Sequence, residues 1–496
     1  MLKRKCVPVL CCLLFVFGSL KVFSQEKYNV LLIISDDLNT SIGPYIDIED
    51  HTPNLTRLSK EGIKFSRAYC QYPLCGPSRA SIMSGLYPET NGVLNNQHVV
   101  GSYRGSTPSL SDHPSIAGFF RQQGYYTARV SKIFHMGVPG GIERGEAGDD
   151  DPDSWDYCYN VLGPETLSKG KLEYLSPEHV HYGSSFARMI LEDGTENTQT
   201  DYIATSQTIA ILENRAGQIA KDATNKVRLK PQSPFFLAVG LVRPHVPLIA
   251  PENCFEPYPE QEMHIPEAII NDDIPDMALK MRNGKIWNMN DIQKKQTISS
   301  YMASVRFMDQ QVGRLLNTLD SLNLREKTIV VFISDHGYNL GEHDCWAKLS
   351  LWEGAIRVPM IISYPDNKES HGKTCETITE LIDLYPTLSE LCGLSDQQPK
   401  ILQGKSYAQY IKDDEPIERQ SVAYTISYNG NAASIRTEEW RYTRWSDNAV
   451  LKGEELYYHV NDPEERDNLA FQPEYQRKLV EMRGLLKSYK LRASNE

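Results

Sequence analysis

Residues 29–38, Asn-Val-Leu-Leu-Ile-Ile-Ser-Asp-Asp-Leu, decide the fold of this 496-residue chain. The run is apolar on both faces, which is typical of a buried strand in a parallel sheet covered by helices. Asp36 and Asp37 follow it directly. Ligands of open α/β sheets collect outside the carboxyl ends of the strands. The stretch therefore predicts a central strand that carries two carboxylates to a site.

Similar apolar runs recur along the chain, at 235–242, 328–334 and 358–363. Helical patterns lie between the runs, at 114–123, 202–220, 298–322 and 379–391. This alternation predicts an α/β fold with a mixed, mainly parallel central sheet sandwiched by helices. Residues 136–200 are rich in Gly, Asp, Pro and Ser, and we interpret them as a long insertion near the site.

The sequence changes in character after Gly393, where four short strand patterns precede one helix. The strand patterns lie at 421–427, 433–436, 441–445 and 455–459, and the helix at 473–490. Four closely spaced strands and a helix predict a smaller C-terminal α+β subdomain built on an antiparallel sheet. We place the main domain at residues 25–397 and the subdomain at 398–496.

The N-terminus has a basic segment, a short apolar run from Cys6 to Leu20 and a small residue at Ser24. This pattern predicts a signal peptide over residues 1–24 and export to the periplasm or beyond the cell. A membrane anchor is the alternative, although the run is short for a bilayer span, so we expect no stable membrane insertion. The net charge of −12 argues against binding to nucleic acid. Seven cysteines remain after residue 24, and the odd number suggests one with a role other than pairing.

A second polar pair, Asp335-His336, follows the run at 328–334 just as Asp36-Asp37 follows the first. Parallel strands would bring both pairs to one edge of the sheet. Three carboxylates and an imidazole favour a hard cation, calcium or magnesium. Each pair alone is equally compatible with a solvated turn or a helix cap.

The segment Cys75-Gly-Pro-Ser-Arg79-Ala-Ser-Ile-Met-Ser-Gly85 resembles the start of a helix, with Pro77 and Ser78 in its first turn. A helix N-terminus favours anions, and Arg79 adds positive charge. The residues alone permit either a thiol nucleophile or a buried structural cysteine beside a capped helix.

The pattern Cys-x-Pro-Ser-Arg followed by Gly85 resembles the signature of type I sulfatases, in which the cysteine is oxidised to formylglycine. Other segments are also similar to sulfatases, and they extend over nearly the whole mature chain: 29–38, 124–135, 233–247, 334–348, 381–388 and 455–470. The segments around 233–247 and 334–348 look closest to the iduronate-2-sulfatase branch. The resemblance implies an alkaline phosphatase-like fold and a sulfuric ester hydrolase.

The resemblance also implies roles for the matching residues. One Ca²⁺ would be held by Asp36, Asp37, Asp335, His336 and the formylglycine made from Cys75 by a formylglycine-generating or anaerobic sulfatase-maturating enzyme. Arg79 would hold the formylglycine hydrate, with Lys132 and His135 near it, while His245 and Lys348 would meet the sulfate and the leaving oxygen. We favour His245 as the general acid. One hydroxyl of the hydrate would attack sulfur, and the second would allow sulfate to leave.

The segment after the signature, residues 86–98, does not match the iduronate-2-sulfatase branch. It predicts sugar recognition by Asn95, Gln97 and His98, with Arg104 as a further candidate. Arg243, beside His245, is an equal candidate for substrate contact and for a salt bridge. We expect a sulfated oligosaccharide or polysaccharide as substrate, with ulvan and glycosaminoglycans both open.

The sequence leaves two other functions open. Phosphoester and phosphonate monoester hydrolases of the same superfamily use similar metal sites, and some carry formylglycine. A phosphatase proper would be expected to use Ser or Thr at position 75 and a second metal. A binding protein for sulfated glycans that has lost catalysis is the other alternative, yet every catalytic position carried over is chemically intact.

Overall fold

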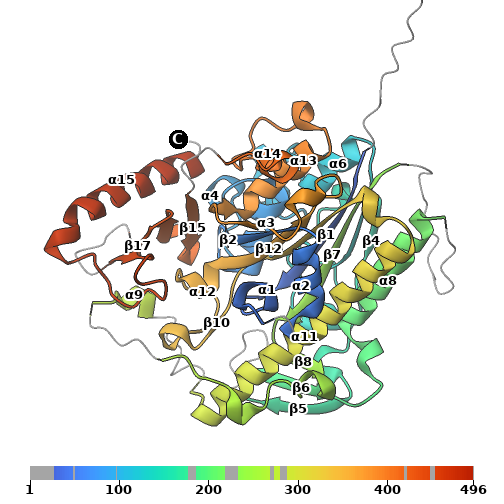
Figure 1. Ribbon diagram of the computed structural model, residues 1–496, viewed down its shortest axis with the longest axis horizontal. Helices are drawn as coiled ribbons and strands as arrows, with labels where there is room; N and C mark the ends of the chain where they lie inside the picture. Colours follow the sequence, from blue (N-terminus) through green and yellow to red (C-terminus); the bar gives the residue numbers. More distant parts are fainter. Residues whose placement is uncertain are drawn as a thin grey trace, which may run out of the picture.

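The computed structural model describes residues 27–48, 51–96, 98–176, 186–217, 233–267, 273–279, 288–417, 422–446 and 453–494. A central mixed sheet organises this part of the chain (Figure 1). The predicted signal peptide lies outside the described residues, so the structure does not bear on it.

The central sheet has β1 (Asn29–Asp36) in its middle, as the opening apolar run predicts. Parallel neighbours flank β1 on both sides, β7 (Phe235–Pro244) and β9 (Thr328–Ser334). The strand order is β13-β2-β12-β9-β1-β7-β3-β4, and β14 also pairs with β2. The remaining strands are β2 (Ile63–Tyr69), β3 (Tyr126–Ser131), β4 (Tyr157–Tyr159), β12 (Arg357–Ser363), β13 (Thr374–Cys375) and β14 (Thr379–Glu380). Because β12 runs antiparallel to both β9 and β2, the predicted mixed, mainly parallel sheet is confirmed.

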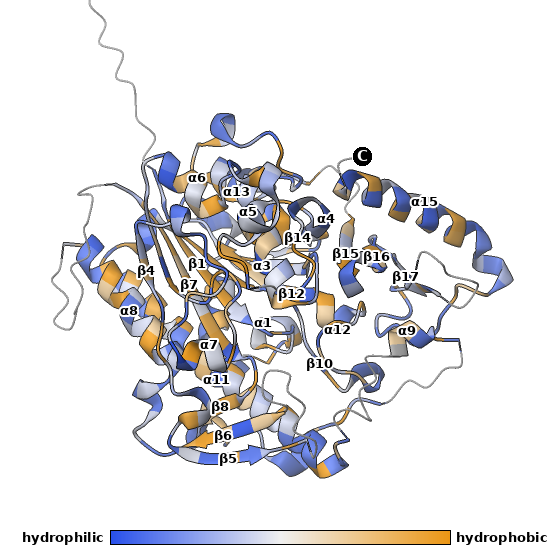
Figure 2. Cartoon of the chain, turned by 180° about the vertical axis from the view of Figure 1, so that it is seen from behind, coloured by the Kyte–Doolittle hydropathy of each residue, from blue (hydrophilic) through white to orange (hydrophobic). Residues whose placement is uncertain are grey.

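Side chains of β1 alternate between two hydrophobic cores, one on each face of the sheet. Val30, Leu32 and Ile34 pack in one core, with α3 (Cys75–Ser84), α6 (Ile116–Gln122) and α13 (Leu384–Leu391). Leu31 and Ile33 pack in the other, with α2 (Pro53–Lys60), α8 (Thr200–Arg215) and α11 (Asp291–Ser321). Burial on both faces explains why the run is uninterrupted by polar residues. Figure 2 shows the apolar strands lying between these helices.

The C-terminal region forms a separate sheet of four antiparallel strands in sequence order. Its strands are β15 (Ala423–Ser427), β16 (Ala432–Arg436), β17 (Trp440–Arg444) and β18 (Glu454–Tyr458), and α15 (Gln476–Ala493) packs on them. The predicted antiparallel α+β unit is therefore confirmed. The exact domain boundary at 397/398 stays a prediction.

The insertion at 136–200 is more regular than its composition suggests. It supplies β4 at one edge of the central sheet. It also forms a small sheet in which β6 (Ala187–Leu191) pairs with β5 (Gly170–Tyr174) and with β8 (Leu248–Pro251). β5 is largely solvent-accessible and shows no apolar run, so its sequence gives little sign of a strand.

Shorter elements connect these layers. The helices are α1 (Gly43–Ile46), α4 (Pro88–Asn91), α5 (Tyr103–Ser106), α7 (Gly140–Glu143), α9 (Asp276–Leu279), α12 (Glu353–Ile356) and α14 (Ala408–Asp413), and the strands are β10 (Asn339–Leu340) and β11 (Trp346–Ala347). Among the described residues no helix is long and apolar enough to cross a bilayer. The seven cysteines after residue 24 are all free thiols in the structure.

Candidate active site

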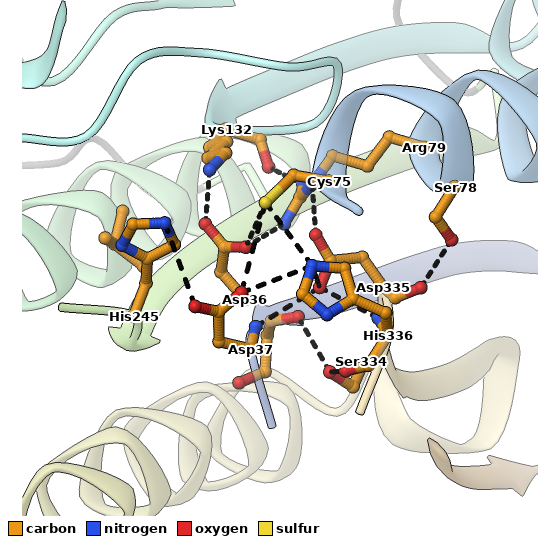
Figure 3. A network of polar contacts seen from close by, with 12 residues as sticks. Asp36, Asp37, Cys75, Ser78, Arg79, Lys132, His245, Ser334, Asp335 and His336 are labelled. Atoms are coloured by element: carbon orange, nitrogen blue, oxygen red, sulfur yellow. Dashed lines mark hydrogen bonds and ion pairs between the residues drawn. The ribbon is translucent and has the colours of Figure 1, made fainter. Parts of the chain in front are cut away.

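The predicted catalytic and metal-binding residues converge at the carboxyl edge of the central sheet, and Figure 3 shows most of them. β1 ends at Asp36 and β9 ends just before Asp335, and these strands are parallel neighbours. α3 begins at Cys75, so its N-terminus faces the same point. The structure therefore brings together residues separated by up to about 300 positions, as the strand-end argument predicts.

Cys75 lies at the centre of the cluster and is only 1 % exposed. Its Sγ is 3.4 Å from Asp36 Oδ1, 3.9 Å from Asp37 Oδ1 and 3.4 Å from His336 Nε2. His336 Nε2 is also 3.2 Å from Asp37 Oδ1. A nucleophile made at position 75 would thus adjoin two carboxylates and an imidazole.

Two fully buried cations hold the carboxylates in place. Arg79 donates from Nε to Asp335 Oδ2 at 2.8 Å, and its Nη2 lies 3.7 Å from Asp36 Oδ1. Lys132 donates to Asp36 Oδ2. Arg79 also donates to the backbone carbonyl of Ile133, which fixes the loop after β3. Ion pairing of this kind is required for charges that are withdrawn from water.

Lys348 and the histidines complete the ring around residue 75. Lys348 Nζ lies 2.6 Å from Asp37 Oδ1 and 3.1 Å from Cys75 Sγ. His245 Nε2 lies 3.8 Å from Asp37 Oδ2, on the side shown at the left of Figure 3. His135 lies close enough to Cys75 for the two groups to shift each other's pKa. All six residues predicted to act in catalysis therefore lie in one cluster.

Strained backbone surrounds the site. Asp37 has φ 64°, Ser131, just before Lys132, has φ 62°, and Ala347 and Leu349, on either side of Lys348, have φ 68° and 77°. Left-handed conformations of non-glycine residues cost about 1–3 kcal/mol each and concentrate at functional sites. These conformations lower the stability of the fold, and they hold Asp37, Lys132 and Lys348 in their positions around residue 75.

Close backbone approach also depends on glycine. At Gly240 of β7, a Cβ atom would lie 2.0 Å from the carbonyl oxygen of Lys132. At Gly148, with φ +65°, a Cβ atom would lie 2.1 Å from the carbonyl oxygen of His135. Side chains at either position would displace the loop that carries Lys132 and His135.

Charge–charge interactions shift the titration of the site. Burial alone raises the pKa of the Cys75 thiol, but Lys132, Lys348 and His336 together lower this pKa well below its usual value. Burial likewise disfavours a charged Lys348, yet Asp37 and Cys75 hold its pKa well above the usual range. The site therefore stabilises negative charge at position 75.

The pKa values of two histidines in the site, His135 and His336, shift in opposite directions. Burial lowers the pKa of His135 to about 4, with Lys132 adding to the effect. Burial also opposes protonation of His336, but Asp335 and Cys75 raise its pKa to about 9. Burial is the main cause that raises the pKa of Asp335 to about 6. These directions describe the protein without a bound cation, which would favour the ionised carboxylates and the neutral His336.

The donor set fits a divalent cation. Ligand atoms of Asp36, Asp37, Cys75 and His336 all lie within 4.8 Å of one another. Asp37 Oδ2 is buried and has no hydrogen-bond partner among the described residues. Three carboxylates are matched by Arg79, Lys132 and Lys348, so a dication would leave the site net positive and attractive to an anion. Asp335 differs from the others because its Oδ1 accepts the amides of Asp37 and His336. Its role as a ligand stays a prediction.

The loop after α4 lies beside the site. Asn96 Oδ1 accepts the amide of Gly76 at 2.8 Å, which ties the loop to the start of α3. Asn95 is exposed, and His98 is exposed with its ring 6.0 Å from that of His135. Asn95 and His98 are thus placed to meet a substrate, whereas Gln97 lies outside the described residues. Sugar recognition by these residues stays a prediction.

Arg104 and Arg243 are engaged elsewhere. Arg104 Nη1 pairs with Asp151 Oδ1 at 2.9 Å. Arg243 is 2 % exposed and pairs with Glu165 at 2.5 Å. Of the two roles considered for Arg243, the structure contains the salt bridge. Both partners are acidic residues of the insertion, and the sequence alone does not reveal these pairings. Substrate contact by Arg104 or Arg243 stays a prediction.

Several residues that support the site were not predicted. Tyr301 OH donates to the carbonyl of Asp37 and accepts the amide of Asn39. Asp149 Oδ1 lies 4.0 Å from His98 Nδ1, and burial raises the pKa of Asp149 to about 6. An aspartate in the Gly- and Asp-rich insertion was a weak signal for Asp149, and nothing in the sequence singles out Tyr301.

Comparisons with known proteins agree with this geometry. Residues 28–394 match the family model described as Sulfatase, and residues 341–492 match the model described as N-sulphoglucosamine sulphohydrolase, C-terminal. A sulfatase of Formosa agariphila is 30 % identical, with 93 % of this chain and 86 % of that protein covered. Human iduronate 2-sulfatase is 28 % identical, with 90 % and 92 % covered. An ulvan-active sulfatase of Formosa agariphila is 26 % identical, with 91 % and 78 % covered.

Solved structures share the fold. One, in complex with its substrate D-glucosamine-2-N,6-O-disulfate, has a TM-score of 0.67 at 21 % identity and covers 95 % of this chain and 99 % of its own. A phosphonate monoester hydrolase from Silicibacter pomeroyi has a TM-score of 0.69 at 20 % identity and covers 94 % and 96 %. At these identities the likeness concerns the alkaline phosphatase-like fold.

Proposed function

The chain belongs to the sulfatase family of sulfuric ester hydrolases, and from that premise we propose that it removes sulfate from oligosaccharides of a sulfated polysaccharide, using formylglycine at position 75 and one Ca²⁺. The observation that carries the proposal is the position of Cys75. Its Sγ lies within hydrogen-bonding distance of Asp36, His336 and Lys348, at the start of α3. A carboxylate cluster with a cationic surround suits an anionic ester.

We propose that Asp36, Asp37, Asp335, His336 and the oxygen of a formylglycine at position 75 hold the calcium ion. When bound, calcium polarises a sulfate oxygen and lowers the pKa of a hydroxyl group. The unpartnered Asp37 Oδ2 supports this assignment. Oxygen-rich ligation favours calcium or magnesium over softer metals.

Formylglycine supplies an aldehyde hydrate, which is a nucleophile with a second hydroxyl available for product release. Cys75 is 1 % exposed and lies in the middle of the fold. A maturating enzyme could reach this side chain only before the domain closes, so we propose that the modification precedes folding.

The cations around residue 75 bind and orient the sulfate. Arg79 Nη2 is buried without a hydrogen-bond partner among the described residues, and Lys348 Nζ faces residue 75. These groups stabilise charge that develops on the sulfuryl oxygens. His245, whose Nε2 lies 3.8 Å from Asp37 Oδ2, donates a proton to the leaving sugar oxygen. His135, whose pKa burial lowers to about 4, is neutral near pH 7 and accepts a proton at residue 75.

We propose that the substrate is a sulfated carbohydrate chain, with ulvan and glycosaminoglycans both candidates. The named relatives act on iduronate 2-sulfate and on ulvan, as their names state. Sugar recognition is assigned to Asn95, Gln97 and His98, and the exposed His98 beside His135 supports this assignment. The N-terminal sequence pattern supports export to the periplasm or the medium.

Phosphonate monoester hydrolysis is the alternative that a specific observation favours, because such a hydrolase shares the fold at a TM-score of 0.69. Comparing turnover of an aryl sulfate, an aryl phosphate and a phenylphosphonate ester separates the two. Preference for sulfate supports the proposal, and a strong preference for either phosphorus ester overturns it.

The deciding experiment joins mass spectrometry of the peptide around residue 75 with sulfate release from sulfated oligosaccharides. The protein is co-expressed with a formylglycine-generating enzyme and assayed with and without a calcium chelator. An aldehyde at residue 75 with chelator-sensitive sulfate release is the expected result. Complete conversion without cleavage of any sulfate ester would favour a binding protein or a phosphoester hydrolase.

A further inference from the structure

A cavity of about 470 Å³ lies between α15 and the C-terminal sheet, away from the cluster around Cys75. Side chains of α15 form one wall, and β17, β18 and the turn before β16 form the other. Two of its lining residues are glycines, Gly430 and Gly484, and a Cβ atom at either would meet nothing within 4 Å. We call this cavity the α15 groove. Figure 1 shows α15 running along the outer side of the sheet.

The α15 groove is strongly basic. Among the described residues that line it, four side chains are cationic, Arg444, Arg483, Lys487 and Lys490, and one, Glu454, is a carboxylate. Glu454 is already occupied, because it accepts from Arg483 Nε at 2.8 Å and from the hydroxyl of Tyr442. The described lining therefore carries more cationic than anionic side chains, on a chain whose net charge is −12.

The spacing of the cations directs them to one side of the helix. Residues 483, 487 and 490 are four and three positions apart, which places them on one face of α15. Lys487 is exposed. Arg483 is fixed in position by a bidentate ion pair with Glu454. Clustered lysines and arginines on one face form a site for polyanions, since sulfate oxygens accept hydrogen bonds from both.

The groove is attached to the segments that build the active site. The turn at its rim lies directly after β15, and the amide of Asn429 in that turn donates to Tyr72 OH at 3.0 Å. Ser427 donates to the carbonyl of Leu349 at 2.9 Å. Tyr72 precedes Cys75 by three residues, and Leu349 follows Lys348 directly. Two hydrogen bonds therefore connect the end of β15 and the turn at the rim of the groove to the segments that carry Cys75 and Lys348.

We propose, resting on the sulfatase function proposed above, that the α15 groove is a second binding site for the substrate polymer and holds sulfated sugar units that are not being cleaved. The ligand class is a polysaccharide that carries several sulfate groups. A short sulfated sugar would occupy the catalytic pocket alone and gain nothing from the groove. A long chain would gain affinity because its second contact is intramolecular once the first has formed.

The test compares two double variants of equal charge. Lys487→Gln with Lys490→Gln removes two cations from the groove. Lys169→Gln with Lys171→Gln removes two exposed cations from the β5 region, which Figure 1 shows on a different side of the molecule. Thermal unfolding of both variants checks that each one folds.

Affinity electrophoresis in gels that contain heparin, ulvan or their desulfated forms measures binding of the polymer without catalysis. We expect the groove variant to bind the sulfated polymers about three- to tenfold more weakly than the control variant, as the loss of two exposed ion pairs would give. We expect its sulfate release from a sulfated monosaccharide to equal that of the control. Equal retardation of the two variants overturns the proposal.

The two proposals fail in different ways. If no sulfate ester is cleaved but retardation still depends on Lys487 and Lys490, the catalytic proposal fails and the groove stands. If sulfate is released while the two variants bind every polymer equally, the groove alone fails. Groove-dependent binding to vesicles of phosphatidylcholine with phosphatidylglycerol, without binding to the polymers, would replace the polysaccharide by a lipid surface and overturn the proposal.

Discussion

Arg243 Nη2 lies 2.5 Å from Glu165 Oε2, and both side chains are buried. The other end of the same guanidinium donates to the carbonyl of His245 at 2.7 Å. Glu165 belongs to the insertion, so one salt bridge joins the insertion to the loop that presents His245. Asp201 steadies the loop further by accepting the amides of Val242 and Arg243 at 2.7 and 2.9 Å. Arg243 is thus a positioning residue for His245.

Replacing Glu165 with Gln should lower kcat through Arg243 and the loop that carries His245. The change keeps the shape but leaves a buried guanidinium without its counter-charge, which costs roughly 3–5 kcal/mol of stability. A displaced His245 should lower kcat about 10- to 100-fold. Steady-state kinetics and thermal unfolding measure the two effects, with the exposed Glu192→Gln of the same insertion as the control. A Glu165→Gln enzyme with the control's kcat and melting temperature would contradict the assignment.

Lys348 is the cation most directly aimed at residue 75, and it is partly open to solvent. Lys348→Met should lower kcat about 100- to 1000-fold, because a charge that stabilises the developing sulfuryl oxygens is lost. The free energy of unfolding should fall as well, by roughly 3–5 kcal/mol, because the buried Asp37 loses the cation that lies 2.6 Å from it. The exposed Lys400→Met provides the control. Wild-type turnover in the Lys348→Met enzyme would remove Lys348 from the mechanism.

The sequence predicts those parts of the fold whose residues share one environment. Strand β1 is buried on both faces and is uniformly apolar, so it was recognisable. Strand β3 is equally buried but reads Tyr-Thr-Ala-Arg-Val-Ser. Its Arg129 is neutralised by Asp150 at 2.6 Å, a partner 21 positions away, so a polar sequence conceals a core strand. The antiparallel direction of β12 is likewise set by its neighbours and leaves no mark in its apolar sequence.

The site shows the same limit. The sequence predicts that two polar pairs meet in the fold, because each pair lies at the end of an apolar strand and the ends of parallel strands lie at one edge of the sheet. These pairs are Asp36-Asp37 and Asp335-His336. Roles that depend on a partner far along the chain were not predictable. Arg243 pairs with Glu165, 78 positions away, and only the folded chain reveals that this guanidinium is already bound.

Calcium should stabilise the folded protein as well as support turnover. Asp37 Oδ2 has no hydrogen-bond partner among the described residues, and a bound cation would be coordinated by this oxygen. Adding Ca²⁺ at about 100 times its Kd to chelated protein should raise the free energy of unfolding by about 2.7 kcal/mol. Thermal unfolding with Ca²⁺ and with Mg²⁺ measures this effect.

Asp37→Asn should abolish the calcium-dependent rise in melting temperature, whereas the exposed Asp193→Asn should retain it. An equal calcium effect in both variants would place the stabilising ion elsewhere. The absence of any effect in the wild-type protein would count against the proposed metal site itself.

Glu455 should make stability depend on pH independently of the active site. Its buried carboxyl accepts from Trp352 Nε1 at 3.1 Å, from Tyr457 OH at 2.6 Å and from Trp445 Nε1. Burial nevertheless raises its pKa to about 7. The folded state therefore binds a proton more tightly than the unfolded state, whose glutamate has a pKa of about 4.3. The contribution of Glu455 to the free energy of unfolding is therefore fully present below about pH 4.3, and it is lost as the pH rises through about 7.

Glu455→Gln removes this titration, so the comparison with wild type isolates it from the carboxylates around Cys75. The free energy of unfolding of wild type minus that of Glu455→Gln should fall by up to about 3 kcal/mol between about pH 4 and pH 8. Denaturant unfolding at several pH values measures the difference, and the exposed Glu464→Gln should show none. A difference that rises with pH would mean that the three donors stabilise the ionised carboxylate more than burial destabilises it.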